Sequence, residues 1–202
     1  MSMLLEGKNI CFRYGQEPWL LQDINLQLEE GERVGLIGPS GCGKSTLAKI
    51  LSGYLKPIRG EVLLAGKPLP EKGYCPVQLI YQHPEKSLNP RWKLGASLAE
   101  GWEPDDQTLE ELGIEKEWLK RYPNELSGGE LQRFCIARVL GHPTRFILAD
   151  EISTMLDVIT QAQIWDVLLK IIKERNMGLL TVTHNRALAE KICTRLIHFE
   201  DL

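Results

Sequence analysis

A glycine-rich segment carries the clearest chemistry in this sequence. Residues 38–45 read Gly-Pro-Ser-Gly-Cys-Gly-Lys-Ser and match the pattern G-x-x-x-x-G-K-[ST]. Glycines let successive backbone N–H groups point at phosphate oxygens, and a helix that starts there adds its favourable dipole. Lys44 can reach the β and γ phosphates, and the Ser45 hydroxyl can bind Mg²⁺. The residues expected to contact a nucleotide here are Gly38, Pro39, Ser40, Gly41, Cys42, Gly43, Lys44, Ser45 and Thr46.

The simpler interpretation of this segment is a glycine-rich turn without a ligand. We favour the nucleotide site because the apolar run at 34–37 predicts a buried strand directly before the segment, and residues 44–52 predict a helix directly after it. This strand–loop–helix context is the one that phosphate binding requires.

A pair of carboxylates forms the second candidate element. Asp150 and Glu151 follow the apolar strand expected at 146–149. On an extended backbone neighbouring side chains point in opposite directions, so the two can have different roles. Asp150 would hold the Mg²⁺ shell, and Glu151 would polarise the water that attacks the γ-phosphate. Without the phosphate-binding loop, acidic residues that merely end a buried strand at the surface would be the better interpretation.

A third element is the sequence Ser127-Gly128-Gly129-Glu130, which precedes a helix expected to run to about residue 140. Ser127 can cap that helix, whose free N–H groups then form another surface for an anion. One nucleotide would not need both surfaces from the same chain.

The rest of the chain predicts the elements that position these residues. Alternating strands and helices indicate a mostly parallel sheet with helices on both faces and ligands at the carboxyl ends of the strands. Strands are expected at 3–12, 19–28, 34–37, 61–65, 79–81, 146–149 and 179–183, and helices at 44–52, 127–140 and 161–174. A turn at 66–68 should follow the strand at 61–65.

The segment 83–126 has a different character. Proline, tryptophan, glycine and charged residues replace the β-branched runs, and 108–113 and 115–122 look like short helices. We therefore expect one domain over 1–202, in which 1–82 and 127–202 form a nucleotide-binding core and 83–126 form an inserted helical lobe.

Composition excludes several classes of protein. The chain has 202 residues and a formal net charge of -3, so no basic field attracts nucleic acid or anionic lipid. Five scattered cysteines indicate reduced thiols in a cytosolic compartment, and we expect neither a disulfide nor a zinc site. No signal peptide or membrane-spanning run is recognisable, so any membrane connection should go through a partner.

Taken together, these residues resemble the ATPase subunits of ATP-binding cassette (ABC) transporters, over essentially the whole chain. The resemblance implies an α/β fold: a P-loop NTPase (RecA-like) core, an N-terminal antiparallel β subdomain and an inserted helical subdomain. The segments that match the family, in its order, are Tyr14, the loop at 38–45, Gln82, the signature sequence at 126–130, Asp150-Glu151, the loop at 154–157 and His184.

The resemblance also assigns roles. It implies that Tyr14 stacks on adenine and that Gln82 senses Mg²⁺ and the attacking water. It implies that Asp157 lies in a loop that crosses a dimer interface, and that His184 contacts the γ-phosphate. Two such domains would pair head to tail, with ATP between the loop of one and Ser127 of the other. Closing needs ATP, and hydrolysis lets the halves part.

The expected partners follow from the same family. They are integral-membrane permeases, a second ATPase subunit in a homo- or heterodimer and, indirectly, a solute-binding protein, at the cytoplasmic face of the membrane. The segments 81–84, 87–91, 121–125 and 161–164 look like the peptide and nickel importer ATPases, including those for metal chelates. Departures from that subfamily are Glu130, Ile152, Thr154-Met155, Asn185, a shorter helical lobe, and an end at Leu202 without the cysteine-bearing extension common in peptide importers.

Two other functions are less consistent with the sequence. A non-transport cassette ATPase that acts on DNA or ribosomes usually needs a long coiled coil or two cassettes in one chain, and a basic surface. None of these features is found in this sequence. A nucleotide-binding regulator without hydrolysis is disfavoured because Lys44, Asp150, Glu151 and His184 are all present.

Overall fold

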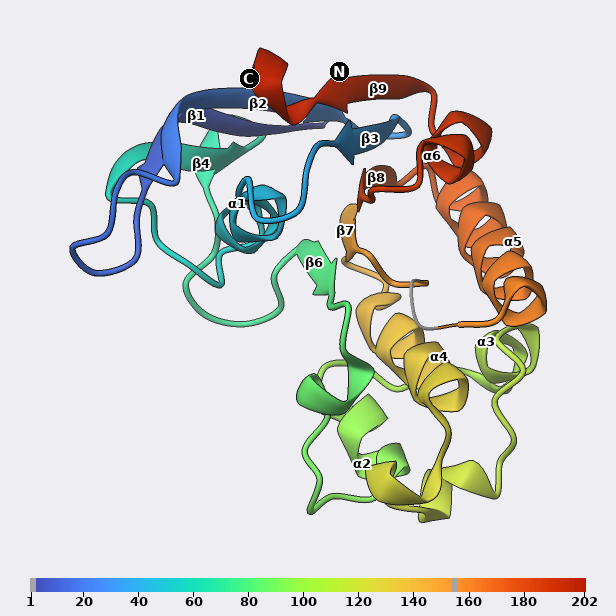
Figure 1. Cartoon of the computed structure of the whole chain (residues 1–202). Coiled ribbons are helices and arrows are strands. Elements are labelled where there is room, and N and C mark those ends of the chain that lie inside the picture. The colour runs from blue at the N-terminus through green and yellow to red at the C-terminus, as the bar shows by residue number, and fades with distance from the viewer. Residues whose placement is uncertain (1–2, 154–155) are drawn as a thin grey trace.

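The computed structural model describes residues 3–153 and 156–202, and within them the strands form two sheets (Figure 1). One sheet is parallel, with the order β6-β7-β8-β3-β9. Its strands are β3 (Arg33–Ile37), β6 (Val77–Ile80), β7 (Phe146–Asp150), β8 (Gly178–Val182) and β9 (Arg195–His198). The expected parallel sheet is therefore confirmed.

The parallel sheet separates two hydrophobic cores. Along β7, Phe146 and Leu148 enter one core, whereas Ile147 and Ala149 enter the other. Side chains alternate in this way on any strand, and a strand covered on both faces must be apolar throughout. This is why the central strands appear in the sequence as short continuous apolar runs.

The first core lies between the parallel sheet, the helix α1 (Lys44–Leu51) and an antiparallel sheet with the order β2-β1-β4-β5. Figure 1 shows α1 below this second sheet. Its strands are β1 (Leu4–Phe12), β2 (Leu21–Glu29), β4 (Arg59–Leu64) and β5 (Lys67–Pro68). The N-terminal strands expected from the sequence are confirmed, but the turn expected at 66–68 is shorter, because Lys67 and Pro68 already pair with β4.

The second core lies on the opposite face of the parallel sheet. It contains α4 (Gly128–Val139), α5 (Val158–Glu174) and the segment 83–126, which has helical turns and no strand. The short elements of that segment are η1 (Pro84–Lys86), α2 (Leu94–Ala99), α3 (Asp106–Glu111), η2 (Trp118–Lys120) and η3 (Pro123–Glu125). Figure 1 shows this segment as a lobe below the sheets.

Several elements differ from the sequence prediction. The helix expected over 115–122 is wrong, because only a 3-10 turn forms at Trp118–Lys120, where Trp118 turns into the core. The helix α2 was not predicted, since six residues with a glycine and no capping side chain have little helical signal of their own. Packing of Leu94 and Leu98, one turn apart and both buried, stabilises it instead.

The C-terminal elements α6 (Arg186–Ile192), β9 and η4 (Phe199–Asp201) were also not predicted. In the described ranges 3–153 and 156–202, no helix is both long enough and apolar enough to cross a lipid bilayer.

A substitution at Gly60 tests how closely β4 approaches β1. Its φ is +84°, and a Cβ there would lie 2.3 Å from the carbonyl oxygens of both Lys8 and Asn9. We expect Gly60→Ala to lower the free energy of unfolding by about 3 kcal/mol or more, because backbone oxygens of a paired strand cannot move aside. Urea denaturation measures this difference.

Gly66→Ala is the matched control, since φ is +73° there but no atom lies within 4 Å of the added Cβ. It should cost only the backbone strain, about 1–2 kcal/mol. Equal losses for the two variants would contradict the proposed clash.

Candidate nucleotide-binding and catalytic site

The glycine-rich loop connects β3 to α1, as the sequence predicted. Gly41 and Gly43 have φ of +82° and +115°, conformations that side chains with a Cβ rarely adopt. Lys44 is 5% exposed, and its Nζ donates hydrogen bonds to the carbonyl oxygens of Gly38 at 2.8 Å and Pro39 at 2.7 Å. The ammonium group thus lies within the curve of the loop, at the N-terminus of the helix.

Ser45 and Asp150 meet where α1 begins and β7 ends. Ser45 Oγ donates a hydrogen bond of 2.9 Å to Asp150 Oδ1. Burial raises the pKa of Asp150, while the hydrogen bond from Ser45 lowers it. The charge of Glu151 raises the pKa further, and the charges of Lys49 and Lys44 oppose that rise. A buried carboxylate beside a hydroxyl is therefore positioned to receive a cation.

Gln82, Glu151 and His184 form a second group next to this pair. Gln82 Nε2 donates to Glu151 Oε2 at 3.2 Å, and His184 Nδ1 lies 3.3 Å from Glu151 Oε1. These residues follow β6, β7 and β8, whose carboxyl ends lie at one edge of the sheet. The sequence placed them apart along the chain, and the structure brings them together.

The backbone at Glu151 differs from the expectation. We expected an extended chain, but φ is +49° at Glu151, which places it in the left-handed region. Its backbone N–H donates to the carbonyl oxygen of Val182. The carboxylates of Asp150 and Glu151 thus have different surroundings because the chain turns sharply as it leaves the strand.

The donor atoms suit the expected ligands. A serine hydroxyl, a buried carboxylate and an amide side chain are the hard oxygen donors that Mg²⁺ prefers. Backbone N–H groups at the start of α1 and the Lys44 ammonium suit the phosphates of a nucleotide. When bound, Mg²⁺ would supply charge neutralisation at those phosphates.

Tyr14 lies near the same helix. Its Oη is 3.1 Å from Oγ1 of Thr46, in the first turn of α1, and its ring packs edge-on against Phe12 with centroids 4.9 Å apart. Tyr14 is 48% exposed, and its hydroxyl lies beside the first turn of the helix that follows the loop.

The signature residues lie elsewhere. Ser127 Oγ accepts the N–H of Glu130, and Glu130 Oε2 accepts the N–H of Ser127, so the two form a capping box at the start of α4. The backbone hydrogen bond from Ser127 is the main cause of the lowered pKa of Glu130. Across the described ranges, residues 127–130 make no hydrogen bond or ion pair with the loop at 38–45. Gly128 and Gly129 sit with them in the first turn of α4.

Asp157 caps α5. Its carboxylate accepts the backbone N–H groups of Ile159 and Thr160, both at 3.0 Å, and the Thr160 hydroxyl at 2.6 Å. These bonds explain why α5 starts at Val158, three residues before the expected start. Thr154 and Met155, two of the departures from the importer subfamily, lie outside the described residues.

The departure at Asn185 has a structural explanation. Asn185 Oδ1 accepts the N–H of Leu188 and caps α6, a role that aspartate fills equally well. Glu130 likewise completes its capping box, and Ile152 is buried in the core.

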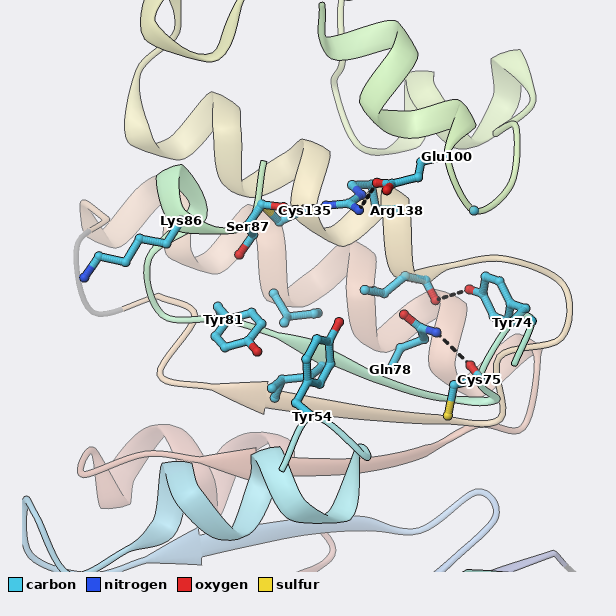
Figure 2. A pocket seen from close by; sticks show the side chains of 15 residues that line it. Tyr54, Tyr74, Cys75, Gln78, Tyr81, Lys86, Ser87, Glu100, Cys135 and Arg138 are labelled. Carbon is cyan, nitrogen blue, oxygen red and sulfur yellow. Dashed lines mark hydrogen bonds and ion pairs between the residues drawn. The ribbon is translucent and has the colours of Figure 1, made fainter. Parts of the chain in front are cut away.

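A cavity of about 720 Å³ lies next to the site and was not predicted (Figure 2). The rings of Tyr54 and Tyr81 line it, and Tyr81 directly precedes Gln82. Across the cavity, Arg138 pairs with Glu100 at 2.6 Å. No motif in the sequence marks this cavity, because the residues that line it come from separate segments of the chain.

Comparisons with known proteins agree with this geometry. Residues 21–154 match the family model described as ABC transporter. The nickel import system ATP-binding proteins NikE of Staphylococcus aureus strains N315 and Mu50 are each 33% identical over 211 residues, which cover 98% of this chain and 87% of theirs.

Among solved structures, the ATP-binding cassette MJ0796, in a dimeric post-hydrolysis state bound to ADP and Pi, has a TM-score of 0.79 and 27% identity. That match covers 96% of this chain and 93% of the other. The cbiO1 protein from Clostridium perfringens shares the fold, with a TM-score of 0.77 and 22% identity over 98% of this chain and 85% of its own.

Asp150→Asn should stabilise the nucleotide-free protein. Since burial raises the pKa of Asp150, the folded chain binds this proton more tightly than the unfolded chain, and the wild type loses stability as pH rises through the folded-state pKa. At pH 8 the variant should melt a few degrees higher than the wild type. In a chain of this size, a gain of about 1 kcal/mol in the free energy of unfolding raises the melting temperature by roughly 2–4 °C. The gain should shrink as the pH is lowered toward about 4.

Thermal denaturation monitored by circular dichroism measures this effect. Asp166→Asn, an exposed position on α5, is the control and should show no such pH-dependent gain. A melting temperature of Asp150→Asn at or below that of the wild type at pH 8 would contradict the argument.

Proposed function

This chain belongs to the ABC transporter family, and we propose that it is the ATP-hydrolysing subunit of an importer. The observation that carries the proposal is the meeting of two groups at one sheet edge. Ser45 and Asp150 are hydrogen-bonded there, and Glu151 lies between Gln82 and His184. Both groups adjoin the phosphate-binding loop.

In this proposal the loop binds the triphosphate of ATP. Its backbone N–H groups face the phosphate oxygens, and Lys44 exchanges its two carbonyl contacts for the β and γ phosphates. Ser45, Asp150 and Gln82 would hold Mg²⁺. Tyr14 stacks on adenine, since its exposed ring lies beside the start of α1.

Glu151 acts as the general base. Its carboxylate accepts a proton from the attacking water, and Gln82 orients that water. His184, already beside Glu151, contacts the γ-phosphate. A low exposure of the Glu151 side chain, 17%, keeps bulk water from competing for this carboxylate.

Two cassettes complete each ATP site. The Ser127 capping box satisfies the N–H group of Glu130, and the N–H groups of Gly128 and Gly129 in the same turn have no partner within the helix. ATP bound by one chain would meet Ser127, Gly128, Gly129 and Glu130 of a second cassette. Asp157 would lie at that interface, where its bonds to α5 fix the approaching loop.

The permease partner would dock at the cavity between β6 and the helical lobe. This surface presents tyrosine rings and a paired arginine, groups typical of protein interfaces. It also adjoins Gln82 through Tyr81, so contact there can reach the catalytic group. We place the chain at the cytoplasmic face of the membrane on this basis, attached through its permeases, with a solute-binding protein delivering the substrate to them.

Nickel, a metal chelate or a peptide is the proposed cargo class. The NikE proteins, named for nickel import, support it, as do the importer-like segments around Gln82 and before Ser127. A role on DNA or ribosomes is not favoured, because the net charge is -3 and the reported relatives are named for nickel import.

Glu151→Gln tests the catalytic assignment. We expect ATP turnover to fall by about 100-fold or more, because a positioned general base contributes about that factor, while ATP affinity stays close to the wild type. Phosphate release and equilibrium binding of ATP are the two measurements. Glu174→Gln, at the exposed end of α5, should leave both unchanged. Undiminished turnover in Glu151→Gln would mean that another group is the base.

Tyr54→Arg tests the docking assignment. Tyr54 is 58% exposed on the cavity, and a bulky cation there should block a docking helix. A tagged wild-type chain should recover polytopic permeases from its native membranes in mild detergent, as identified by mass spectrometry, and the variant should recover several-fold less with ATP binding intact.

Ile58→Arg is the control, since Ile58 is 51% exposed and does not line the cavity. Equal recovery by Tyr54→Arg and Ile58→Arg would refute docking at this cavity. Recovery of ribosomal or DNA-repair proteins without a permease would refute the importer function.

A further inference from the structure

Lys49 lies close to the proposed magnesium site without belonging to it. It follows Ser45 by four residues in α1, so both side chains lie on one side of the helix. Ser45 in turn donates a hydrogen bond of 2.9 Å to Asp150 Oδ1, so Lys49 lies one helical turn from the contact between Ser45 and Asp150. The ammonium group is thus a positive charge near a carboxylate that is expected to bind Mg²⁺.

An aromatic ring holds this ammonium group. Lys49 Nζ lies 5.8 Å from the centroid of the Tyr81 ring, within the range of a cation–π contact. The Tyr81 ring therefore helps to fix the position of the Lys49 ammonium group.

Tyr81 also lines the cavity. Tyr54 packs edge-on against it, with ring centroids 5.5 Å apart and an interplanar angle of 79°. Both rings line the cavity of about 720 Å³ in Figure 2. Tyr81 thus both lines the cavity and contacts Lys49, and the next residue in the chain is Gln82.

We propose that Lys49 and Tyr81 are a positioning pair that sets the magnesium affinity of the ATP site and links it to the docking cavity. The proposal rests on the function proposed above. A cation beside Asp150 competes with Mg²⁺ for its negative field, and the Tyr81 ring fixes where that cation sits. A partner that displaces the ring changes the field at Asp150, and by linkage Mg²⁺ changes the affinity for that partner.

The test compares two equilibrium affinities for ATP, one with Mg²⁺ and one with EDTA. All variants carry Glu151→Gln, so that ATP turnover is too slow to disturb the binding equilibrium. Lys49→Met should raise the ratio of the two affinities by about tenfold, a modest figure for a unit charge near a metal ligand close to the surface. Tyr81→Leu should raise the ratio by a smaller factor, since Lys49 remains but is no longer held.

Conservative variants separate this role from a purely structural one. Lys49→Arg keeps the cation and Tyr81→Phe keeps the ring face, so both should retain the parent ratio. An unchanged ratio in Lys49→Met, or equal ratios in Tyr81→Phe and Tyr81→Leu, would overturn the proposal even if stability changed. If the parent chain bound no ATP at all, the proposed function would fall first, and this proposal with it.

The link to the cavity is tested on the complex with its permeases. The affinity ratio of the parent chain should differ between the free and the complexed state, and Tyr81→Leu should abolish that difference while Tyr81→Phe keeps it. A difference that persists in Tyr81→Leu would refute transmission through the ring.

Discussion

The hydrogen bond between Ser45 and Asp150 is the contact on which the site depends. It joins residues 105 positions apart and fixes the start of α1 against the end of β7. It also stabilises a carboxylate that is only 4% exposed, whose ionised form burial disfavours. The chain maintains this arrangement with a hydroxyl and with lysine charges rather than with a full ion pair. The negative charge of Asp150 is therefore only partly balanced in the free protein, and a bound cation can balance it.

The order of the parallel strands explains why the other groups gather around that bond. The strands β6, β7 and β8 are neighbours, so Gln82, Glu151 and His184 leave the sheet side by side although they are far apart in sequence. Helix caps fix the positions of three further residues. Ser127, Asp157 and Asn185 each satisfy the N-terminal amides of a helix, and each follows directly from the turn that starts it. Ser127 and Asp157 thus have a structural role as well as an expected functional one, so substituting either would affect both stability and function.

Sequence patterns predicted the parts in which local chemistry decides the structure. The glycine loop needs positive φ at Gly41 and Gly43, and the central strands need apolar residues on both faces, so both leave clear patterns. The lobe was predicted less well. Its short elements depend on burying Leu94, Leu98 and Trp118 against distant partners, and their own propensities are weak. The contact of Lys49 with Tyr81 joins two separate elements, and no single segment of sequence encodes it.

The strained backbone at Glu151 is held in place by residues around it that are also expected to act in catalysis. A non-glycine residue at φ +49° costs on the order of 1–3 kcal/mol and persists only where its surroundings hold it. Here the Glu151 N–H is bonded to Val182, and its carboxylate contacts Gln82 and His184. These bonds reach the ends of both neighbouring strands. The left-handed conformation of Glu151 is therefore stabilised by the residues with which Glu151 is expected to act. It follows that the position of the carboxylate is sensitive to displacement of either neighbouring strand end, including the one that carries Tyr81 and Gln82.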